Sequence, residues 1–285
     1  MNAFRRLLAG AEPVFAPLVF NPLSAMLAEA AGFKALYLGG GAMGYVKCGT
    51  EAQLSLTEMA QAALDIRTVC ALPLILDGAC GWGDPMHVER TVRASEAAGF
   101  CAIEIEDQIL PKRAHHHIGI EHMIPAEQMT AKIAAAVAAR SDPDFVIIGR
   151  TNALRSTGLD DALRRAEAYR EAGADMLYVT GRKPEDVRAL GERLAPPLMY
   201  MTGAGGLSAS GFAAADLYRL GFRLIVDPTT PLLAAHKAMR QSYAALARGE
   251  PDPLLGSEPG AEQQAIHRTI DLDHMLEVER RTVEK

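Results

Sequence analysis

The 285-residue sequence contains no run of about 18 apolar residues, the length that a membrane-spanning helix requires. The N-terminal segment has an arginine pair but no long apolar stretch ending in a small-residue cleavage site, so we expect no secretory signal. The four cysteines form no CxxC pair, which is typical of a protein in the reduced cytoplasm. Charges of both signs are interspersed around a net charge of −6, which excludes an extended basic surface for nucleic acid. We therefore expect a cytoplasmic protein that binds neither membranes nor nucleic acid.

Short apolar runs alternate with longer amphipathic segments along nearly the whole chain. With 49% hydrophobic residues the chain can bury one large core, and about 200–250 residues is an ordinary size for a single barrel. The runs are rich in Val, Ile, Leu and Tyr, as expected for strands buried on both faces of a parallel sheet. The predicted strands are 14–20, 35–40, 72–78, 101–107, 145–151, 176–181, 198–203 and 223–228.

The junctions before strands two to eight alternate between two types. Four helices end in a glycine where a left-handed cap is expected, and the intervening helices reach their strands through proline. These residues are Gly32, Gly99, Gly173 and Gly221, and Pro73, Pro143, Pro196 and Pro197. Four copies of a doubled βα unit explain this alternation and predict a (β/α)8 TIM barrel, with an open doubly wound sheet as the alternative.

The last part of the chain lies beyond the eight-unit count. We predict a barrel domain over 1–250, and a linker with a C-terminal helical extension over 251–285. The linker is rich in proline and glycine, and the helix is expected over 262–281. This surplus helix must pack elsewhere on the barrel or on a neighbouring subunit.

Barrel enzymes react at the C-terminal ends of their strands. Those ends carry carboxylates, a glycine turn with free backbone N–H groups, an arginine and a few neutral polar residues. The carboxylates are Asp77, Glu104, Glu106, Asp107 and Asp227, the turn is Gly39, Gly40, Gly41 and Ala42, and the others are Arg150, Asn152, Thr180 and Thr202. Carboxylates that hold a divalent cation beside an arginine suit an anionic, oxygen-rich substrate and stabilise an enolate.

Each of these features also has a purely structural interpretation. The glycines after the second strand can be ordinary turn residues. Asp84, which precedes Pro85, is expected to cap a helix. Arg150 can serve as a structural partner of Glu106 instead of a substrate ligand.

Several motifs in the right order give the chain a family resemblance. The segment 74–113, LILDGACGWGDPMHVERTVRASEAAGFCAIEIEDQILPKR, resembles the signature region of the isocitrate lyase/phosphoenolpyruvate mutase superfamily, and segments 20–41, 145–153 and 166–179 resemble other family segments. The resemblance covers residues 3–250. It implies a (β/α)8 barrel, an Mg²⁺ cofactor with Mn²⁺ as the alternative ion, and a C-terminal helix swapped between subunits of a dimer of dimers.

The resemblance also assigns roles to individual residues. Asp77 matches the aspartate that contacts the metal, Glu106 the glutamate that holds metal-bound water, and Glu51 an aspartate of the loop after strand two. Arg150 matches the arginine that binds the substrate carboxylate, and we predict a catalytic role for it as well. The resemblance also places the backbone amides of Gly40, Gly41 and Ala42 at the substrate. We add Thr202 to the predicted substrate site from its position at the end of the seventh strand.

Four positions depart from the family pattern. Ala79 replaces the second aspartate of D-x-D-x-G, which predicts weaker metal binding unless Glu51 or Glu104 compensates. Ala114 stands where the lyases carry a cysteine that donates a proton, and Thr180 and Met201 replace a glutamate and an asparagine.

Three consecutive histidines follow Ala114 in the same loop. His115, His116 and His117 are expected to replace the missing proton donor, since histidine titrates near neutral pH. The alternatives are that these histidines are solvated, that one of them holds the loop closed, or that the cluster binds a second metal with His122.

The leading hypothesis is an Mg²⁺-dependent lyase that cleaves a C–C bond in a small 2-hydroxy or 2-oxo dicarboxylate. Decarboxylation of an oxaloacetate-like acid needs no cysteine and is the second hypothesis. A phosphonopyruvate-type hydrolase or mutase is weaker, because nothing in the sequence marks a phosphonate site. A non-catalytic barrel that binds a carboxylate is the hypothesis from a different class.

Overall fold

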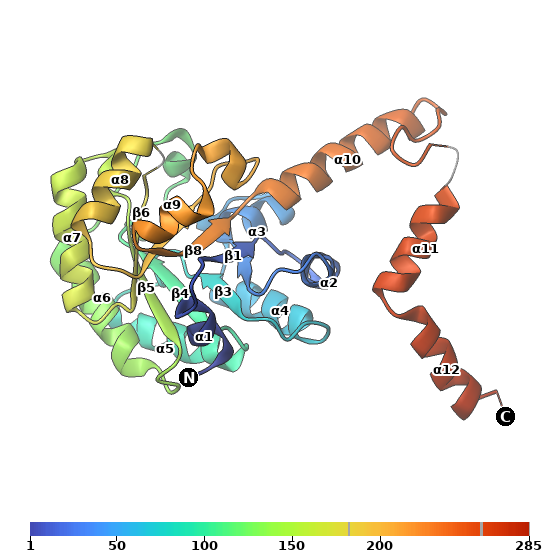
Figure 1. The fold of residues 1–285 in the computed structure, drawn as a ribbon, viewed down its shortest axis with the longest axis horizontal. Coiled ribbons are helices and arrows are strands. Elements are labelled where there is room, and N and C mark those ends of the chain that lie inside the picture. The colour runs from blue at the N-terminus through green and yellow to red at the C-terminus, as the bar shows by residue number, and fades with distance from the viewer. Residues whose placement is uncertain (182, 257–258, 285) are drawn as a thin grey trace. The chain divides into compact units, whose positions relative to one another are not determined.

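The computed structural model describes residues 1–181, 183–256 and 259–284. Eight parallel strands form one sheet in the order β1-β8-β7-β6-β5-β4-β3-β2 (Figure 1). An additional parallel bridge between Leu18 and Tyr37 joins the two ends of this sheet, so the strands close into a barrel. The strands are β1 Val14–Pro17, β2 Leu36–Leu38, β3 Leu74–Asp77, β4 Ala102–Glu106, β5 Val146–Thr151, β6 Met176–Val179, β7 Leu198–Met201 and β8 Phe222–Asp227. The predicted (β/α)8 barrel is therefore confirmed.

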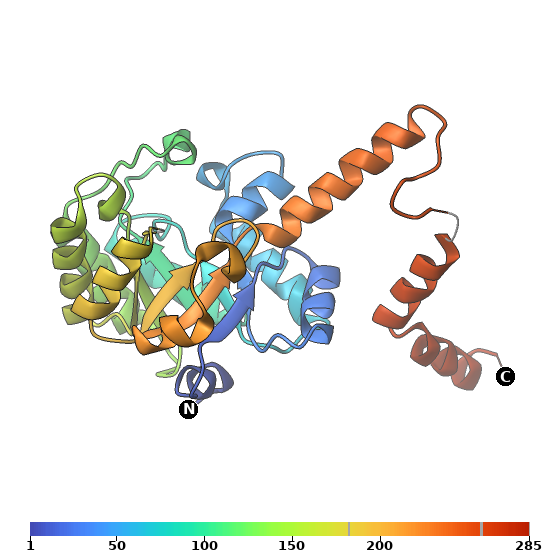
Figure 2. The same cartoon turned by 45° about the horizontal axis from the view of Figure 1, so that its top comes forward.

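Helices surround the strands (Figure 2). They are α1 Ala3–Leu8, α2 Pro22–Ala30, α3 Gly40–Val46, α4 Leu56–Arg67, α5 Pro85–Ala97, α6 Ala126–Ala139, α7 Leu159–Glu171, α8 Pro184–Arg193 and α9 Ala214–Arg219, with short 3-10 turns η1 Glu51–Gln53, η2 Ala114–Ile118, η3 Ala153–Arg155 and η4 Leu207–Ser210. The predicted glycine caps have the left-handed conformation, with φ of 94° at Gly32 and 103° at Gly173. Asp84 immediately precedes α5, as predicted.

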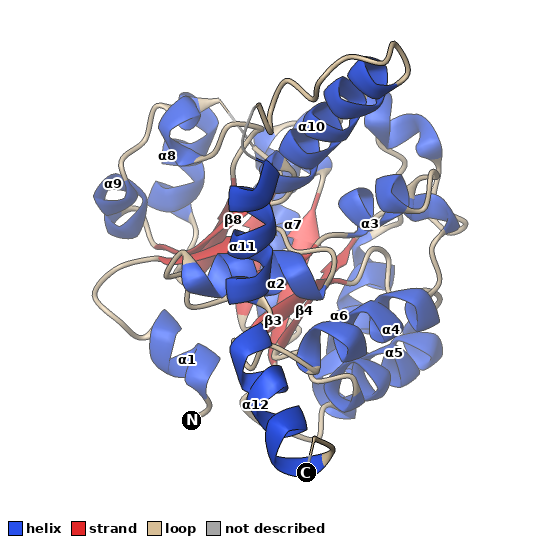
Figure 3. Ribbon diagram, turned by 90° about the vertical axis from the view of Figure 1, so that its right-hand side faces the viewer, coloured by secondary structure: helices blue, strands red, loops and turns tan. Residues whose placement is uncertain are grey.

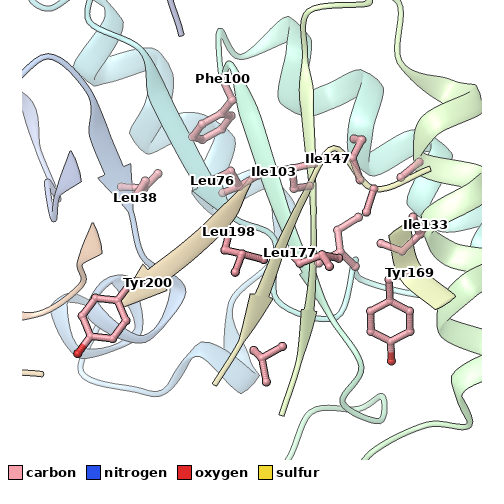
Figure 4. Close-up of a cluster of buried hydrophobic side chains, with 14 of the residues drawn as sticks. Leu38, Leu76, Phe100, Ile103, Ile133, Ile147, Tyr169, Leu177, Leu198 and Tyr200 are labelled. Atoms are coloured by element: carbon pink, nitrogen blue, oxygen red, sulfur yellow. The ribbon is translucent and has the colours of Figure 1, made fainter. Parts of the chain in front are cut away.

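The core has two layers because alternate residues of each strand point in opposite directions. One layer fills the barrel, and Ile75, Ile148 and Leu224 belong to it together with Phe4 of α1. The other lies between strands and helices, and it includes Leu76, Ile103 and Ile147 (Figure 4). Most strands are buried along their whole length, which explains why they read as continuous apolar runs.

The C-terminal part, 231–285, forms a compact unit of its own. It contains α10 Thr230–Leu246, α11 Pro259–Thr269 and α12 Leu272–Thr282 (Figure 3). The prediction of one helix over 262–281 is wrong, because Asp271 adopts the left-handed conformation with φ of 55° and separates α11 from α12. The chain divides after residue 230, earlier than the predicted end of the barrel domain at residue 250. The predicted domain boundary stays a prediction. Among the described residues, no helix combines the length and apolar character that crossing a membrane requires.

Candidate active site

A cavity of about 370 Å³ opens at the C-terminal ends of the strands. Its lining includes Asp77, Arg150, Glu51 and the start of α3. A larger hollow of about 660 Å³ lies beside α1 and β1, but Glu12 is the one acidic residue in its lining. The convergence of charged groups therefore marks the smaller cavity as the candidate active site.

Asp77 is fixed at the end of β3 by two backbone amides. Its Oδ2 accepts a hydrogen bond from Gly40 N at 2.9 Å, and its Oδ1 accepts one from Ala79 N at 3.0 Å. Burial, followed by the nearby Glu51 charge, raises the pKa of Asp77. Both carboxylate oxygens are thus oriented by the main chain before any ligand binds.

The predicted glycine turn is the beginning of α3, with Gly39 as its first cap residue. The Gly40 amide donates to Asp77, so this predicted substrate ligand supports the carboxylate in this structure. Gly41 and Ala42 also lie in the first turn, where backbone N–H groups have no partner within the helix. Their amides are available to an anion in the cavity that both residues line.

Arg150 lies between the two glutamates of β4. Its Nη1 contacts Glu104 Oε1 at 2.5 Å and its Nε contacts Glu106 Oε2 at 3.2 Å. The parallel register pairs Glu106 with Arg150 directly, which explains this proximity. The guanidinium also lies 5.1 Å from the centre of the Tyr178 ring. The structural interpretation of Arg150 as a partner of Glu106 is confirmed, while the side chain still lines the cavity.

The two glutamates differ in how well their charges are compensated. Burial raises the pKa of Glu104 to about 7, although the ion pair with Arg150 acts in the opposite direction. Burial also opposes ionisation of Glu106, but Arg150 and Lys112 outweigh it and lower the pKa of Glu106. Glu106 is therefore the ionised partner, and Glu104 also accepts a hydrogen bond from the Tyr37 hydroxyl at 3.1 Å.

Lys112 brings a second cation into the cluster from the loop after β4. Its ammonium group pairs with both Glu51 and Glu106, and its side chain is 4% exposed. Burial opposes the charge on Lys112, but Glu106 and Glu51 raise its pKa. We did not assign Lys112 a role from the sequence, because one lysine in a loop gives no signal of a buried position.

The three loop histidines occupy different surroundings. His116 Nε2 lies 2.9 Å from Glu51 Oε1, and His117 Nδ1 lies 3.2 Å from the Tyr45 hydroxyl. Both line the cavity. His115 instead faces His122, with 3.1 Å between their ring nitrogens, and it is not among the cavity-lining residues. Burial opposes protonation of His116, but its hydrogen bond to Glu51 and the Glu51 charge raise its pKa.

The later strands contribute neutral groups. Thr180 Oγ1 donates to Asn152 Oδ1 at 2.9 Å, and Asn152 Nδ2 donates to Glu106 Oε2 at 2.9 Å. Thr180 and Met201 line the cavity. Thr202 is 1% exposed, and its hydroxyl is the one buried side-chain oxygen or nitrogen without a partner among the described residues.

Asp107, directly after β4, is buried in a hydrogen-bond network that joins β4 to β5 and α7. It accepts hydrogen bonds from Thr151 Oγ1 at 2.6 Å, Tyr169 Oη at 2.8 Å and Asn152 N at 3.1 Å, and it pairs with Arg165. This network fixes the end of β5 against β4. Two of its donors, Thr151 and Asn152, lie at the end of β5, and the other two, Arg165 and Tyr169, lie one turn apart on α7.

The charges of the cluster fit a divalent cation. Four carboxylates, Glu51, Asp77, Glu104 and Glu106, face two permanent cations, Lys112 and Arg150. Within the described ranges, no three His, Cys, Asp or Glu side chains form a ready-made metal cluster. Magnesium usually takes one or two carboxylates and keeps several waters, so a set of hard oxygen donors of this kind still suits it.

Comparison with known proteins identifies the family. The family model of phosphoenolpyruvate phosphomutase matches residues 4–247. The chain belongs to this family. It is therefore an enzyme of the isocitrate lyase/phosphoenolpyruvate mutase superfamily, whose members are C–C lyases or mutases.

The relatives carry out several reactions. The chain is 34% identical to 2,3-dimethylmalate lyase of Eubacterium barkeri, covering 85% of this chain and 84% of the relative. It is 38% identical to 2-methylisocitrate lyase of Aeropyrum pernix, over 82% and 75% of the two chains. Identity to an oxaloacetate decarboxylase of Rhodopseudomonas palustris is 33%, over 98% and 97%.

Solved structures agree with the fold over almost the whole chain. The phosphoenolpyruvate phosphomutase of Streptomyces platensis superposes with a TM-score of 0.88 at 29% identity, covering 99% of this chain and 98% of that one. A phosphonopyruvate hydrolase in complex with oxalate and Mg²⁺ gives 0.84 at 28% identity, over 99% and 98%. The family assignment from sequence motifs is thus confirmed.

Replacing Gly44 is expected to displace Glu51. A Cβ at position 44 would lie 2.5 Å from both Thr50 C and Glu51 N, which are backbone atoms and cannot rotate away. We expect Gly44→Ala to lower the free energy of unfolding by about 2 kcal/mol in urea titrations. Gly49→Ala is the control, since its Cβ would lie 2.7 Å from the end of the Gln53 side chain and 3.9 Å from the backbone oxygen of Gly44. Equal stability of both variants would show that the loop does not depend on this close approach.

Proposed function

We propose that this chain is an Mg²⁺-dependent lyase that cleaves a C–C bond in a small 2-hydroxy or 2-oxo carboxylate or dicarboxylate through an enolate-type intermediate. The observation that carries the proposal is the gathering of four buried carboxyl groups, Glu51, Asp77, Glu104 and Glu106, beside Arg150 at the cavity. Such a cavity suits a cation and an anionic substrate together. It also lies where barrel enzymes react.

Asp77, Glu106 and Glu51 are the proposed metal residues. Asp77 is oriented by two backbone amides, and the other two carboxylates share the Lys112 ammonium group. Magnesium, or manganese as the alternative, would stabilise negative charge on the substrate oxygens when bound. Because Lys112 already compensates Glu51 and Glu106, rearrangement of this ion pair would release both carboxylates.

The substrate carboxylate is proposed to bind at the start of α3 and Arg150. Gly41 and Ala42 supply first-turn amides, and Arg150 supplies a guanidinium held in place by Glu104 and Glu106. Thr202 was predicted to belong to this site, but it is buried and is not among the cavity-lining residues, so the geometry gives that role less support. Fixed donors of this kind orient a substrate without reorganising during the reaction.

His116 and His117 are the proposed source of the proton. When the C–C bond breaks, its electron pair remains on the enolate fragment, and a proton must return to that carbon. Both histidines line the cavity, on the loop that carries Ala114 at the position of the lyase cysteine. His115 was predicted to share this role, but its contact with His122 gives that role less support.

Decarboxylation of an oxaloacetate-type acid is the second candidate. The observation that favours it is the combination of Ala114, Thr180 and Met201, which leaves the cavity with fewer polar groups than the lyase pattern has. Loss of carbon dioxide also leaves an enolate but needs no contacts to a second large fragment. The coverage of the oxaloacetate decarboxylase relative supports the same reaction.

We also propose a homo-oligomer, a dimer of helix-swapped dimers. The helices of the C-terminal unit expose large apolar side chains, including Met239, Tyr243, Met275 and Leu276. Exposed apolar residues on helices are typical of surfaces that another chain covers. Residence in the cytoplasm stays a prediction.

Magnesium should stabilise the protein. At a concentration about 100 times its Kd, Mg²⁺ is expected to add about 2.7 kcal/mol to the free energy of unfolding, seen as a rise in melting temperature. Asp77→Ala should abolish this rise, because Asp77 is the proposed direct ligand. Asp160→Ala removes a carboxylate that is 95% exposed and should leave the rise unchanged. Absence of any magnesium effect on the unaltered protein would contradict the metal site.

A substrate screen tests the reaction. With Mg²⁺ present, we expect a 2-oxo acid product from substituted malates, detected by a coupled pyruvate assay, or carbon dioxide and pyruvate from oxaloacetate. Asp77→Ala provides the inactive control. Phosphonopyruvate belongs in the screen because phosphonopyruvate hydrolases share this fold. If no acid in the screen gives a product, the result would favour the non-catalytic barrel that binds a carboxylate.

Replacing His116 and His117 together by alanine should lower kcat. Loss of a positioned proton donor typically costs about 10²- to 10⁴-fold, whereas substrate binding should change much less. His115→Ala is the matched control on the same loop, since His115 contacts His122 outside the cavity lining. Unchanged kcat in the double variant would remove the proton-donor role from this loop.

A further inference from the structure

Two arginines line the candidate active site, and they differ in their partners. Arg150 pairs with Glu104 and Glu106 of the barrel, and its side chain is 14% exposed. Arg155, in η3 directly after β5, is 32% exposed. Its Nη1 contacts Glu121 Oε1 at 3.1 Å, and within the described ranges its other side-chain donors have no protein partner. Arg155 therefore has unused hydrogen-bond donors at the cavity wall.

Glu121 belongs to the segment between β4 and α6. A bridge between Gln108 and Met123 closes the base of this segment. The Glu121 side chain is only 1% exposed, and its second oxygen accepts a hydrogen bond from the Gln108 amide. The same segment carries Lys112 and His116. The Arg155–Glu121 pair consequently joins the wall of the cavity to the segment that supplies its proposed proton donor.

We infer that Arg155 binds the second carboxylate of a short dicarboxylate substrate, and that Glu121 takes that place when substrate is absent. A guanidinium offers five N–H donors in a planar fork and binds a carboxylate best through two of them. Glu121 engages one nitrogen of Arg155, so a carboxylate in the cavity can gain a second contact.

This inference deepens the proposed function and rests on it for the position of the first carboxylate. Arg150 of β5 is already paired with Glu104 and Glu106 of the neighbouring strand β4 and is proposed to bind the first carboxylate. A second carboxylate of the substrate therefore needs another cation. Arg155 meets this need from the same cavity. Monocarboxylates would leave Arg155 with Glu121 and gain nothing from it. Arg155 thus selects dicarboxylates over monocarboxylates.

L-malate and L-lactate test the inference, because malate is lactate with one added carboxylate. Binding of each acid to the full-length protein with Mg²⁺ is measured by calorimetry. The unaltered protein should bind malate more tightly than lactate. Arg155→Met should weaken malate binding about 10- to 100-fold, the range of a charge-assisted pair, and should leave lactate binding unchanged. Arg155→Lys should recover part of the difference.

Glu121→Gln separates substrate binding from loop support. It breaks the same ion pair as Arg155→Met but keeps the guanidinium, so malate affinity should be retained or increased. If Arg155 only supports the loop, both variants would weaken malate and lactate equally, and the inference would be overturned. Equal or undetectable binding of both acids by the unaltered protein would overturn it as well. Because binding is measured without turnover, malate selectivity in a protein that cleaves nothing would contradict the proposed reaction alone.

Discussion

The structure depends on the cost of burying Glu104 and Glu106 inside the mouth of the barrel. The two residues are separated by one position on β4, so both side chains point to the same face of the strand. Each is 1% exposed, and an unpaired buried carboxylate costs several kcal/mol. A core built for packing alone would place apolar side chains there. The two glutamates therefore require cations, and Arg150 and Lys112 meet that requirement.

Arg150 and Lys112 supply this compensation in different ways. Arg150 stands on the neighbouring strand in direct register with Glu106, so the barrel itself fixes that contact. Lys112 comes from a loop and joins Glu106 to Glu51, a residue of another loop. If the proposed metal ion binds, this second contact is the one that would have to rearrange, because it joins two loops and not two strands. The same pair of buried carboxylates thus has one partner fixed by the strands, Arg150, and one partner carried by a loop, Lys112.

The fold could be predicted because its signals are local. Gly173 caps a helix through its own backbone freedom, and buried strands are apolar at every position. Asp77, Glu106 and Arg150 could be placed because each ends a strand, and strand ends of a barrel share one face. Lys112, Tyr37 and Arg155 could not be assigned, since their roles arise from contacts such as Tyr37 to Glu104, 67 positions apart. The break at Asp271 was missed because aspartate adopts a left-handed backbone too rarely for sequence to reveal it.

Ala79 departs from the family pattern in its side chain but keeps backbone hydrogen bonds to Asp77 and Glu106. Ala79 has φ of 46°, a conformation that costs an alanine about 1 kcal/mol or more. Its N–H donates to Asp77 and its carbonyl accepts from Glu106 N at 2.8 Å. The backbone at this position therefore joins the Asp77 carboxylate of β3 to the main chain of β4 at Glu106, through groups that every residue type except proline carries. Alanine at this position lacks the acidic group of the family pattern, while its backbone still contacts Asp77 Oδ1 and Glu106 N. We therefore expect this departure from the family pattern to affect metal affinity, and not the assembly of the site.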